Sequence, residues 1–143
     1  MYVKQISVFL ENNKGTLAPL TRLLGENGID LIALSIADTE QYGILRCIVP
    51  DSDLAIKVLR DAGYSVRETQ VLAVCVQDEP GGLADILDTL ADGDISVEYL
   101  YSFVRSTGKY ALVIFHLSNL ESGEKALRDK NVKLLDLEQI RAL

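Results

Sequence analysis

Two short loops rich in glycine and polar residues are the places where this chain could bind a small charged molecule. Each follows an alternating apolar stretch and precedes a helical pattern, with Gly15 before one predicted helix and Gly81 before the other. A helix that begins directly after a glycine leaves backbone N–H groups without partners at an end of partial positive charge, which favours binding of a carboxylate. Glycine also permits close approach, because it has no side chain.

A bound amino acid also needs an acceptor for its ammonium group. Near the first loop, Glu11, Asn12, Asn13 and Asp30 are the candidates. Charge-assisted hydrogen bonds contribute about 1.5–3 kcal/mol each, so two or three of them support micromolar binding, about −8 kcal/mol, after ordering costs. The alternative is a structural role, because Asn and Gly are common turn and cap residues. The first loop is favoured over the second, where Pro80 removes a donor.

The two loops belong to an internal repeat, which divides the chain into segments 1–69 and 70–143. A shift of 66 residues aligns Gly15 with Gly81, and past the next turn a shift of 68 aligns Tyr42 with Tyr110. The segment between the halves contains no cluster of Pro, Gly or Ser, so we expect two strands end to end rather than a flexible linker.

Hydrophobic periodicity predicts the same order in both halves: strand, helix, strand, strand, helix, strand. In the first half, Gly25 and Gly28 are expected to end the first helix, and Leu54, Val58, Leu59 and Ala62 to form the buried stripe of the second. The predicted strands cover 2–10, 31–37, 42–49, 64–69, 71–76, 95–104, 110–117 and 132–135, with helices near 15–25, 51–62, 83–90 and 121–130 and a short terminal helix within 136–143.

This order predicts an α+β fold made of two ferredoxin-like βαββαβ units, each an antiparallel sheet with helices on one face. In the third strands, the helix-facing set is Leu45, Cys47, Val49, Val113, Phe115 and Leu117, and the outer set is Ile44, Arg46, Ile48, Leu112, Ile114 and His116. The outer set is apolar enough to predict a homodimer through a sheet face. Tyr99, Tyr101 and Phe103 share one strand face, where they either pack against small residues or line a ligand pocket.

The loop-to-helix motif resembles that of the ACT domain, a small-molecule regulatory module of amino-acid metabolism. Its residues are Asn-x-x-Gly-x-Leu from Asn12 to Leu17 and Glu-Pro-Gly-Gly-Leu from Glu79 to Leu83, each between the first strand and first helix of a βαββαβ unit. The resemblance covers the whole chain as two ACT units without a catalytic domain, as in free-standing tandem ACT proteins.

The resemblance implies a regulatory protein that binds an amino acid, or a similar small metabolite, at an interface between ACT units. The implied contacts come from the first loop and the adjoining second strand of each half: Glu11, Asn12, Asn13, Gly15, Thr16, Leu17, Asp30, Leu31, Asp78, Glu79, Gly81, Gly82, Leu83, Ser96 and Val97. Family members often have Asn where this chain has Asp30 and Ser96, so the identity of the ligand does not transfer.

The composition argues against other classes of function. A net charge of −7 and a pI near 4.6 do not suit nucleic acid or anionic lipid, which require clustered Lys and Arg. No apolar run approaches the roughly 20 residues of a membrane span, and no signal-type segment begins the chain, so a cytoplasmic protein is expected.

Catalysis and metal binding are not expected either. His116 is the single histidine and has no arranged nucleophile, Cys47 and Cys75 lie in apolar strands, and Asp85, Asp88 and Asp92 are interpreted as acids on a helix surface. No cofactor motif is present. Two hypotheses remain: an amino-acid sensor, or a subunit that docks on a metabolic enzyme without binding a metabolite.

Overall fold

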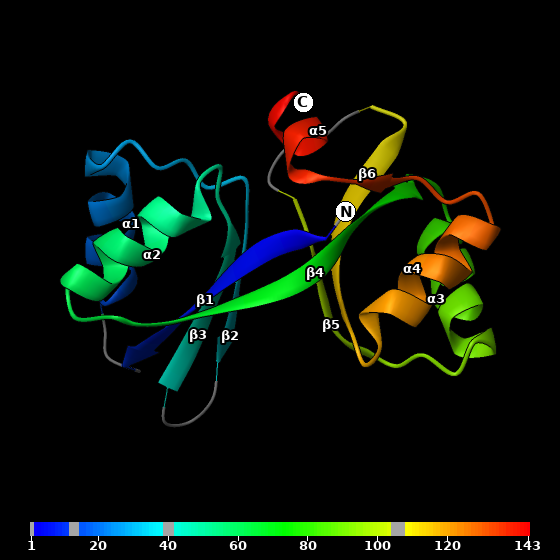
Figure 1. The fold of residues 1–143 in the computed structure, drawn as a ribbon, viewed down its shortest axis with the longest axis horizontal. Coiled ribbons are helices and arrows are strands. Elements are labelled where there is room, and N and C mark those ends of the chain that lie inside the picture. The colour runs from blue at the N-terminus through cyan, green and yellow to red at the C-terminus, as the bar shows by residue number, and fades with distance from the viewer. Residues whose placement is uncertain (1, 12–14, 39–41, 104–107) are drawn as a thin grey trace. The chain divides into compact units, whose positions relative to one another are not determined.

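The computed structural model describes residues 2–11, 15–38, 42–103 and 108–143. The chain divides into two compact units, Lys4–Thr69 and Gln70–Leu143, and the second unit also takes in Met1–Val3. We refer to them as the N-terminal unit and the C-terminal unit and describe each by itself (Figure 1).

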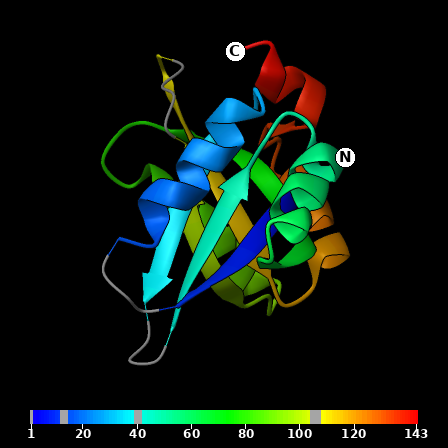
Figure 2. The ribbon, with the colours of Figure 1, turned by 90° about the vertical axis from the view of Figure 1, so that its left-hand side faces the viewer.

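The N-terminal unit is an antiparallel sheet covered on one face by two helices. Its elements are β1 (Val3–Glu11), α1 (Leu17–Glu26), β2 (Ala33–Asp38), β3 (Tyr42–Ile48), α2 (Ser52–Asp61) and the first part of β4 (Ser65–Gln77). The strand order is β2-β3-β1-β4. Figure 2 shows α1 and α2 in front of the strands, on the same side.

Alternation along the strands produces the core of this unit. Val8 pairs with Leu45, and both are buried on the face toward the helices, whereas Ile36, the other partner of Leu45, is 46% exposed on the edge strand β2. Leu20 and Leu24 of α1 and Leu59 of α2 complete the core and are buried, as the helix-facing set of β3 is.

The C-terminal unit repeats this arrangement. It contains the rest of β4, α3 (Gly82–Asp92), β5 (Val97–Ser102), β6 (Tyr110–Leu117), α4 (Leu120–Asp129), β7 (Leu134–Leu135) and α5 (Leu137–Arg141). Its strands follow the order β7-β4-β6-β5, with β4 in the position that β1 holds in the other unit. The predicted α+β class, with two ferredoxin-like antiparallel units, is therefore confirmed.

Several details differ from the prediction. β4 is one continuous strand of 13 residues where two strands end to end were expected, because nothing between Ser65 and Gln77 interrupts an extended backbone. Gly25 lies inside α1, and the left-handed residue that follows this helix is Gly28. In α2, Leu54 and Ala62 are exposed, while Ser52 and Ala55 are buried instead.

The outer face of the C-terminal sheet is partly covered within the chain. Leu112 and Ile114 are buried, and α5, whose Ile140 is also buried, lies on the side of the sheet away from α3 and α4 (Figure 1). These two residues therefore do not offer the free apolar surface on which the predicted homodimer depended, and homodimerisation stays a prediction.

Candidate ligand-binding site

The helices that follow the two glycine loops lack the side-chain caps of the other helices. Asp51, Asn119 and Asp136 each accept a hydrogen bond from a backbone N–H in the first turn of α2, α4 and α5. Thr16 before α1 and Gly81 before α3 make no such bond. Thr16 and Gly81 therefore do not cap these helices with their side chains, and the start of α3, where the whole preceding loop is described, is available to an external acceptor.

The backbone at the start of α3 shows which groups are free. The N–H of Gly82 donates to the carbonyl of Glu79 at 3.0 Å, and that of Asp85 donates to Gly81 at 3.0 Å. Within the described residues, the N–H groups of Leu83 and Ala84 have no partner. Two adjacent donors at the positive end of a helix form a suitable carboxylate site.

The glycines that precede the two helices adopt the same conformation. Gly15 has a φ of +83° and Gly81 a φ of +87°, in the left-handed region that favours glycine. The repeat therefore preserves not only the residue type but the backbone turn that leads from strand to uncapped helix.

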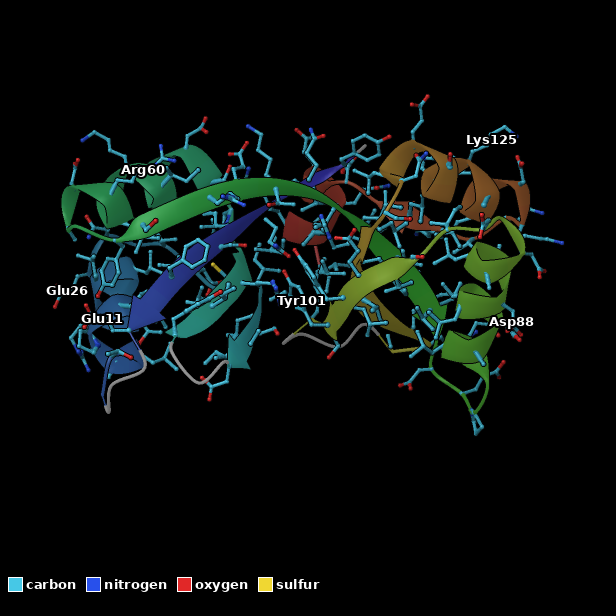
Figure 3. All side chains as sticks on the ribbon, turned by 90° about the horizontal axis from the view of Figure 1, so that it is seen from below. Glu11, Glu26, Arg60, Asp88, Tyr101 and Lys125 are labelled. Carbon is cyan, nitrogen blue, oxygen red and sulfur yellow. The ribbon has the colours of Figure 1, made fainter. Side chains whose placement is uncertain are left out.

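A cavity lies beside the uncapped helix in the N-terminal unit. It has a volume of about 490 Å³, and we call it the N-terminal cavity. Among the residues that the structure describes, its one charged lining residue is Glu11, labelled at the end of β1 in Figure 3. The lining residues are Phe9, Leu10, Glu11, Gly15, Thr16, Pro19, Gly63, Tyr64 and Ser65.

The C-terminal unit contains a cavity at the equivalent position, between the end of β4, α3 and the turn from α4 to β7. This C-terminal cavity has a volume of about 320 Å³. Ile86 and Val132 are apolar, whereas Asp85, Lys130 and Lys133 add charge. The full lining is Cys75, Gln77, Gly82, Asp85, Ile86, Thr89, Tyr110, Lys130, Asn131, Val132 and Lys133.

Local hydrogen bonds fix the walls of the C-terminal cavity. Thr89 donates its hydroxyl to the carbonyl of Asp85 at 2.9 Å, one turn earlier on α3. The backbone of Cys75 in β4 donates to the carbonyl of Lys133 at 2.9 Å, and Asn131 has a φ of +57° in the turn. The turn that carries the two lysines is thus attached to the central strand.

The two cysteines have raised pKa values because they are removed from water. Burial raises the pKa of the Cys47 thiol to about 12. Burial also raises the pKa of Cys75, while the charge of Lys133 partly lowers it. The ammonium of Lys133 is therefore close enough to act on a thiol that lines the C-terminal cavity.

The structure places the predicted loop residues beside the cavities. Glu11, Gly15 and Thr16 line the N-terminal cavity, and Gly82 lines the C-terminal one. Asp78 and Glu79 line an adjoining cavity of about 310 Å³, together with Gln77, Lys109 and Tyr110. Gly81, Leu83 and Leu17 lie at the helix starts outside the cavity walls, and Asn12 and Asn13 lie outside the described residues.

The predicted second-strand residues lie elsewhere. Asp30 and Leu31 follow the far end of α1, and Ser96 and Val97 follow the far end of α3. A helix of ten residues is about 15 Å long. Within one unit, the loop and the strand start are therefore too far apart for one small amino acid to touch both.

The sequence prediction missed the turn after the second helix of each unit. Ser65 and Lys133 occupy equivalent positions in the repeat and line equivalent cavities. Asp85, interpreted as a surface acid, lines the C-terminal cavity as well. The repeat could have indicated this turn, because Gly63 and Asn131 occupy equivalent positions and both adopt a left-handed conformation.

The aromatic strand residues do not contribute to either cavity. The ring of His116 stacks on Tyr99 with centroids 4.7 Å apart, and its Nδ1 lies 2.9 Å from a carboxylate oxygen of Glu98. Tyr101 and Phe103 are buried. No group of three metal-ligating side chains occurs within the described ranges. No helix among the described residues is long and apolar enough to cross a membrane.

Two units with one strand order, each with a glycine turn, an uncapped helix and a cavity beside it, define a tandem of ferredoxin-like modules. The family model described as "ACT domain pair" matches residues 1–143, so the chain belongs to this family. The resemblance inferred from the sequence is confirmed.

Solved structures agree with this assignment. Protein BT0572 from Bacteroides thetaiotaomicron is 37% identical, with 100% of this chain and 98% of that chain covered and a TM-score of 0.92. The ligand-free regulatory subunit of aspartate kinase from Thermus thermophilus is 18% identical, with 90% of each chain covered and a TM-score of 0.64. The corresponding subunit from Thermus flavus is 14% identical, with 88% and 90% covered and a TM-score of 0.62. No curated protein matches.

Proposed function

We propose that this chain is a non-catalytic regulatory protein that binds an amino acid, with 1–69 and 70–143 acting as two ACT units. The observation that supports the proposal is the same constellation in both units: a left-handed glycine, an uncapped helix and a cavity. Family membership places the chain among ACT domain pairs, and the constellation supports the proposal that this pair binds a ligand.

The chemistry of the constellation suits the two ends of an amino acid. The free N–H groups of Leu83 and Ala84 can donate to the carboxylate. Asp85 on the same helix, or Glu11 in the N-terminal unit, can accept from the ammonium group. A regulator must also bind its ligand with different affinities in two conformations or in two partner-bound states.

A thermal-shift screen with the common amino acids tests this function directly. Ligand at 100 times its Kd stabilises the folded state by about 2.7 kcal/mol, and a chain of this size gains roughly 2–4 °C per kcal/mol. We expect one or a few amino acids to raise the Tm by several degrees and to accompany the protein in native mass spectrometry. A screen in which no amino acid changes the Tm contradicts the proposal.

A separate experiment tests whether the residues after α1 and α3 also contact the ligand. Asp30→Ala and Ser96→Ala alter the second-strand positions that the family resemblance implied, whereas Thr16→Val alters the wall of the N-terminal cavity. If the ligand touches only the cavities, the Tm shift survives the first two changes. Loss of the shift in Asp30→Ala shows instead that the strand start also binds.

The second candidate function is a subunit that docks on a metabolic enzyme. Solved structures of similar fold are named as regulatory subunits of aspartate kinase. Leu34 in β2 and Leu100 in β5 occupy equivalent positions, and each is 37% exposed on an edge strand. Light scattering of the purified chain measures homodimerisation. If an enzyme copurifies with the chain and no amino acid changes the Tm, the docking subunit is favoured.

A further inference from the structure

We propose that the C-terminal cavity selects an acidic amino acid, a ligand with two carboxylates and one ammonium group. This inference rests on the proposed function, because it names the class of ligand for one of the two cavities. Its basis is the charge of the cavity wall, which contains two lysines, Lys130 and Lys133, and one acid, Asp85. A ligand with two negative charges and one positive charge is complementary to that wall.

The lysines of the described residues fall into two groups. Lys4, Lys57 and Lys125 each have a carboxylate oxygen within 4.0 Å. Lys109, Lys130 and Lys133 form no ion pair with any residue that the structure describes. These three line the C-terminal cavity and the adjoining one.

Lys130 and Lys133 lie on the same cavity wall, on either side of Asn131 and Val132. The sequence as a whole has 21 acidic residues against 14 basic ones, so the charge of this wall is opposite in sign to that of the chain. In the C-terminal cavity itself, Lys130 and Lys133 stand against the single acid Asp85, so the described wall carries one excess positive charge. A bound anion would neutralise it through charge-assisted hydrogen bonds.

The positions of the charges match the shape of the ligand. Lys130 and Lys133 come from the turn between α4 and β7, whereas Asp85 comes from α3, the other wall of the cavity. Lys133 and Cys75 line the same cavity, and the charge of Lys133 lowers the pKa of the Cys75 thiol. An acidic amino acid can therefore direct its side-chain carboxylate to the lysines and its ammonium to Asp85, while its α-carboxylate faces the start of α3. A volume of about 320 Å³ is within the range of small-molecule sites.

The N-terminal cavity lacks this charge pattern. Ser65 stands where the C-terminal unit has Lys133, and Pro19 stands where it has Asp85. No lysine or arginine occurs among the described residues that line it, so the described wall offers no cation to a second carboxylate. Asp78 and Glu79 belong to the adjoining cavity with Lys109 and do not line the C-terminal cavity itself. The selection is therefore expected in one unit only.

Calorimetric titration of the full chain tests the inference with L-aspartate and L-glutamate as ligands. L-alanine lacks the second carboxylate and succinate lacks the ammonium, so both serve as comparison ligands. Each missing charge-assisted contact should weaken binding about tenfold or more. We therefore expect at least one acidic amino acid to bind with a Kd about tenfold or more below that of either comparison ligand.

Single substitutions assign the effect to the cavity. Lys130→Gln and Lys133→Gln should each weaken binding of the acidic amino acid about tenfold, and Asp85→Asn should weaken the amino acid but not succinate. Lys125→Gln is the matched control, because Lys125 is exposed on α4 (Figure 3) and pairs with Asp129 at 3.0 Å. The bound ligand should also slow the labelling of Cys75 by a thiol reagent.

The outcomes separate this inference from the proposed function. If a neutral amino acid binds as tightly as aspartate and glutamate, or if both lysine variants retain wild-type affinity, charge selection is wrong and amino-acid binding stands. If no amino acid binds, both proposals are wrong. Circular dichroism of each variant shows whether a loss of affinity is only a loss of fold.

Discussion

Gly82, the first residue of α3, approaches the backbone carbonyl of Gln77 so closely that a Cβ at position 82 would overlap the carbonyl oxygen. This contact holds the start of α3 against the end of β4, where both elements line the C-terminal cavity. The equivalent residue in the N-terminal unit is Thr16, which has a side chain. The first residue of α3 therefore has no room for a Cβ, whereas the equivalent residue before α1 carries a side chain.

Replacement of Gly82 should destabilise the chain, because a backbone oxygen cannot move aside as a flexible side chain can. Gly82→Ala is expected to lower the free energy of unfolding by about 2–3 kcal/mol through overpacking. Gly25→Ala is the matched control: a Cβ there meets nothing within 4 Å, and an alanine inside α1 should stabilise by about 0.5–1 kcal/mol. Urea denaturation measures both, and equal effects would contradict the overlap.

The side-chain caps of α2 and α4 should each contribute measurably to stability. Asp51 accepts from the N–H of Leu54 at 3.1 Å, and Asn119 accepts from Ser122 at 3.0 Å. Asp51→Ala and Asn119→Ala should each cost about 1 kcal/mol in thermal unfolding. Asp51→Asn and Asn119→Asp keep an acceptor oxygen, so they should retain most of that stability. Equal losses in the conservative and alanine variants would show that the caps do not act through this bond.

The burial of each leucine in α2 and α4 should determine how much its replacement by alanine lowers the free energy of unfolding. Its place in the apolar pattern of the sequence should matter less. Leu59 and Leu127 are equivalent in the repeat and fully buried, one in each unit. Leu59→Ala and Leu127→Ala should each cost about 2–5 kcal/mol. Leu54→Ala should cost much less, because Leu54 is 42% exposed. The same urea experiment compares them, and a large loss in Leu54→Ala would contradict its placement.

The two thiols should react at different rates, because the thiolate is the reactive form. With a pKa of about 12, Cys47 should react near pH 8 only when the chain opens. Cys75 should react faster than Cys47 but slower than a free thiol, and its rate should rise with pH. Lys133→Gln removes the charge that lowers the pKa of Cys75, so labelling should slow at a fixed pH below that pKa. An unchanged rate in this variant would place the Lys133 ammonium away from the thiol.

The sequence alone determined the repeated βαββαβ order, the helix-facing residues of the third strands and the family. These features depend on local physics: alternation places Leu45 and Phe115 on the core face, and Asp51 is a good cap wherever a helix begins. The positions of Gly15 and Gly81 before their helices were also predicted from residue type, because few other residues adopt a positive φ.

Only the tertiary structure showed which polar residues gather around one cavity. Asp85, Lys130 and Lys133 are far apart in sequence and have the composition of solvated surface, so no local pattern distinguishes them. Within one unit, the length of α1 separates Asp30 from the first loop, although the two are near in sequence, and a ligand contact by Asp30 stays a prediction. The distances between these charged side chains depend on how α3, α4 and β4 pack together, which the sequence does not specify locally.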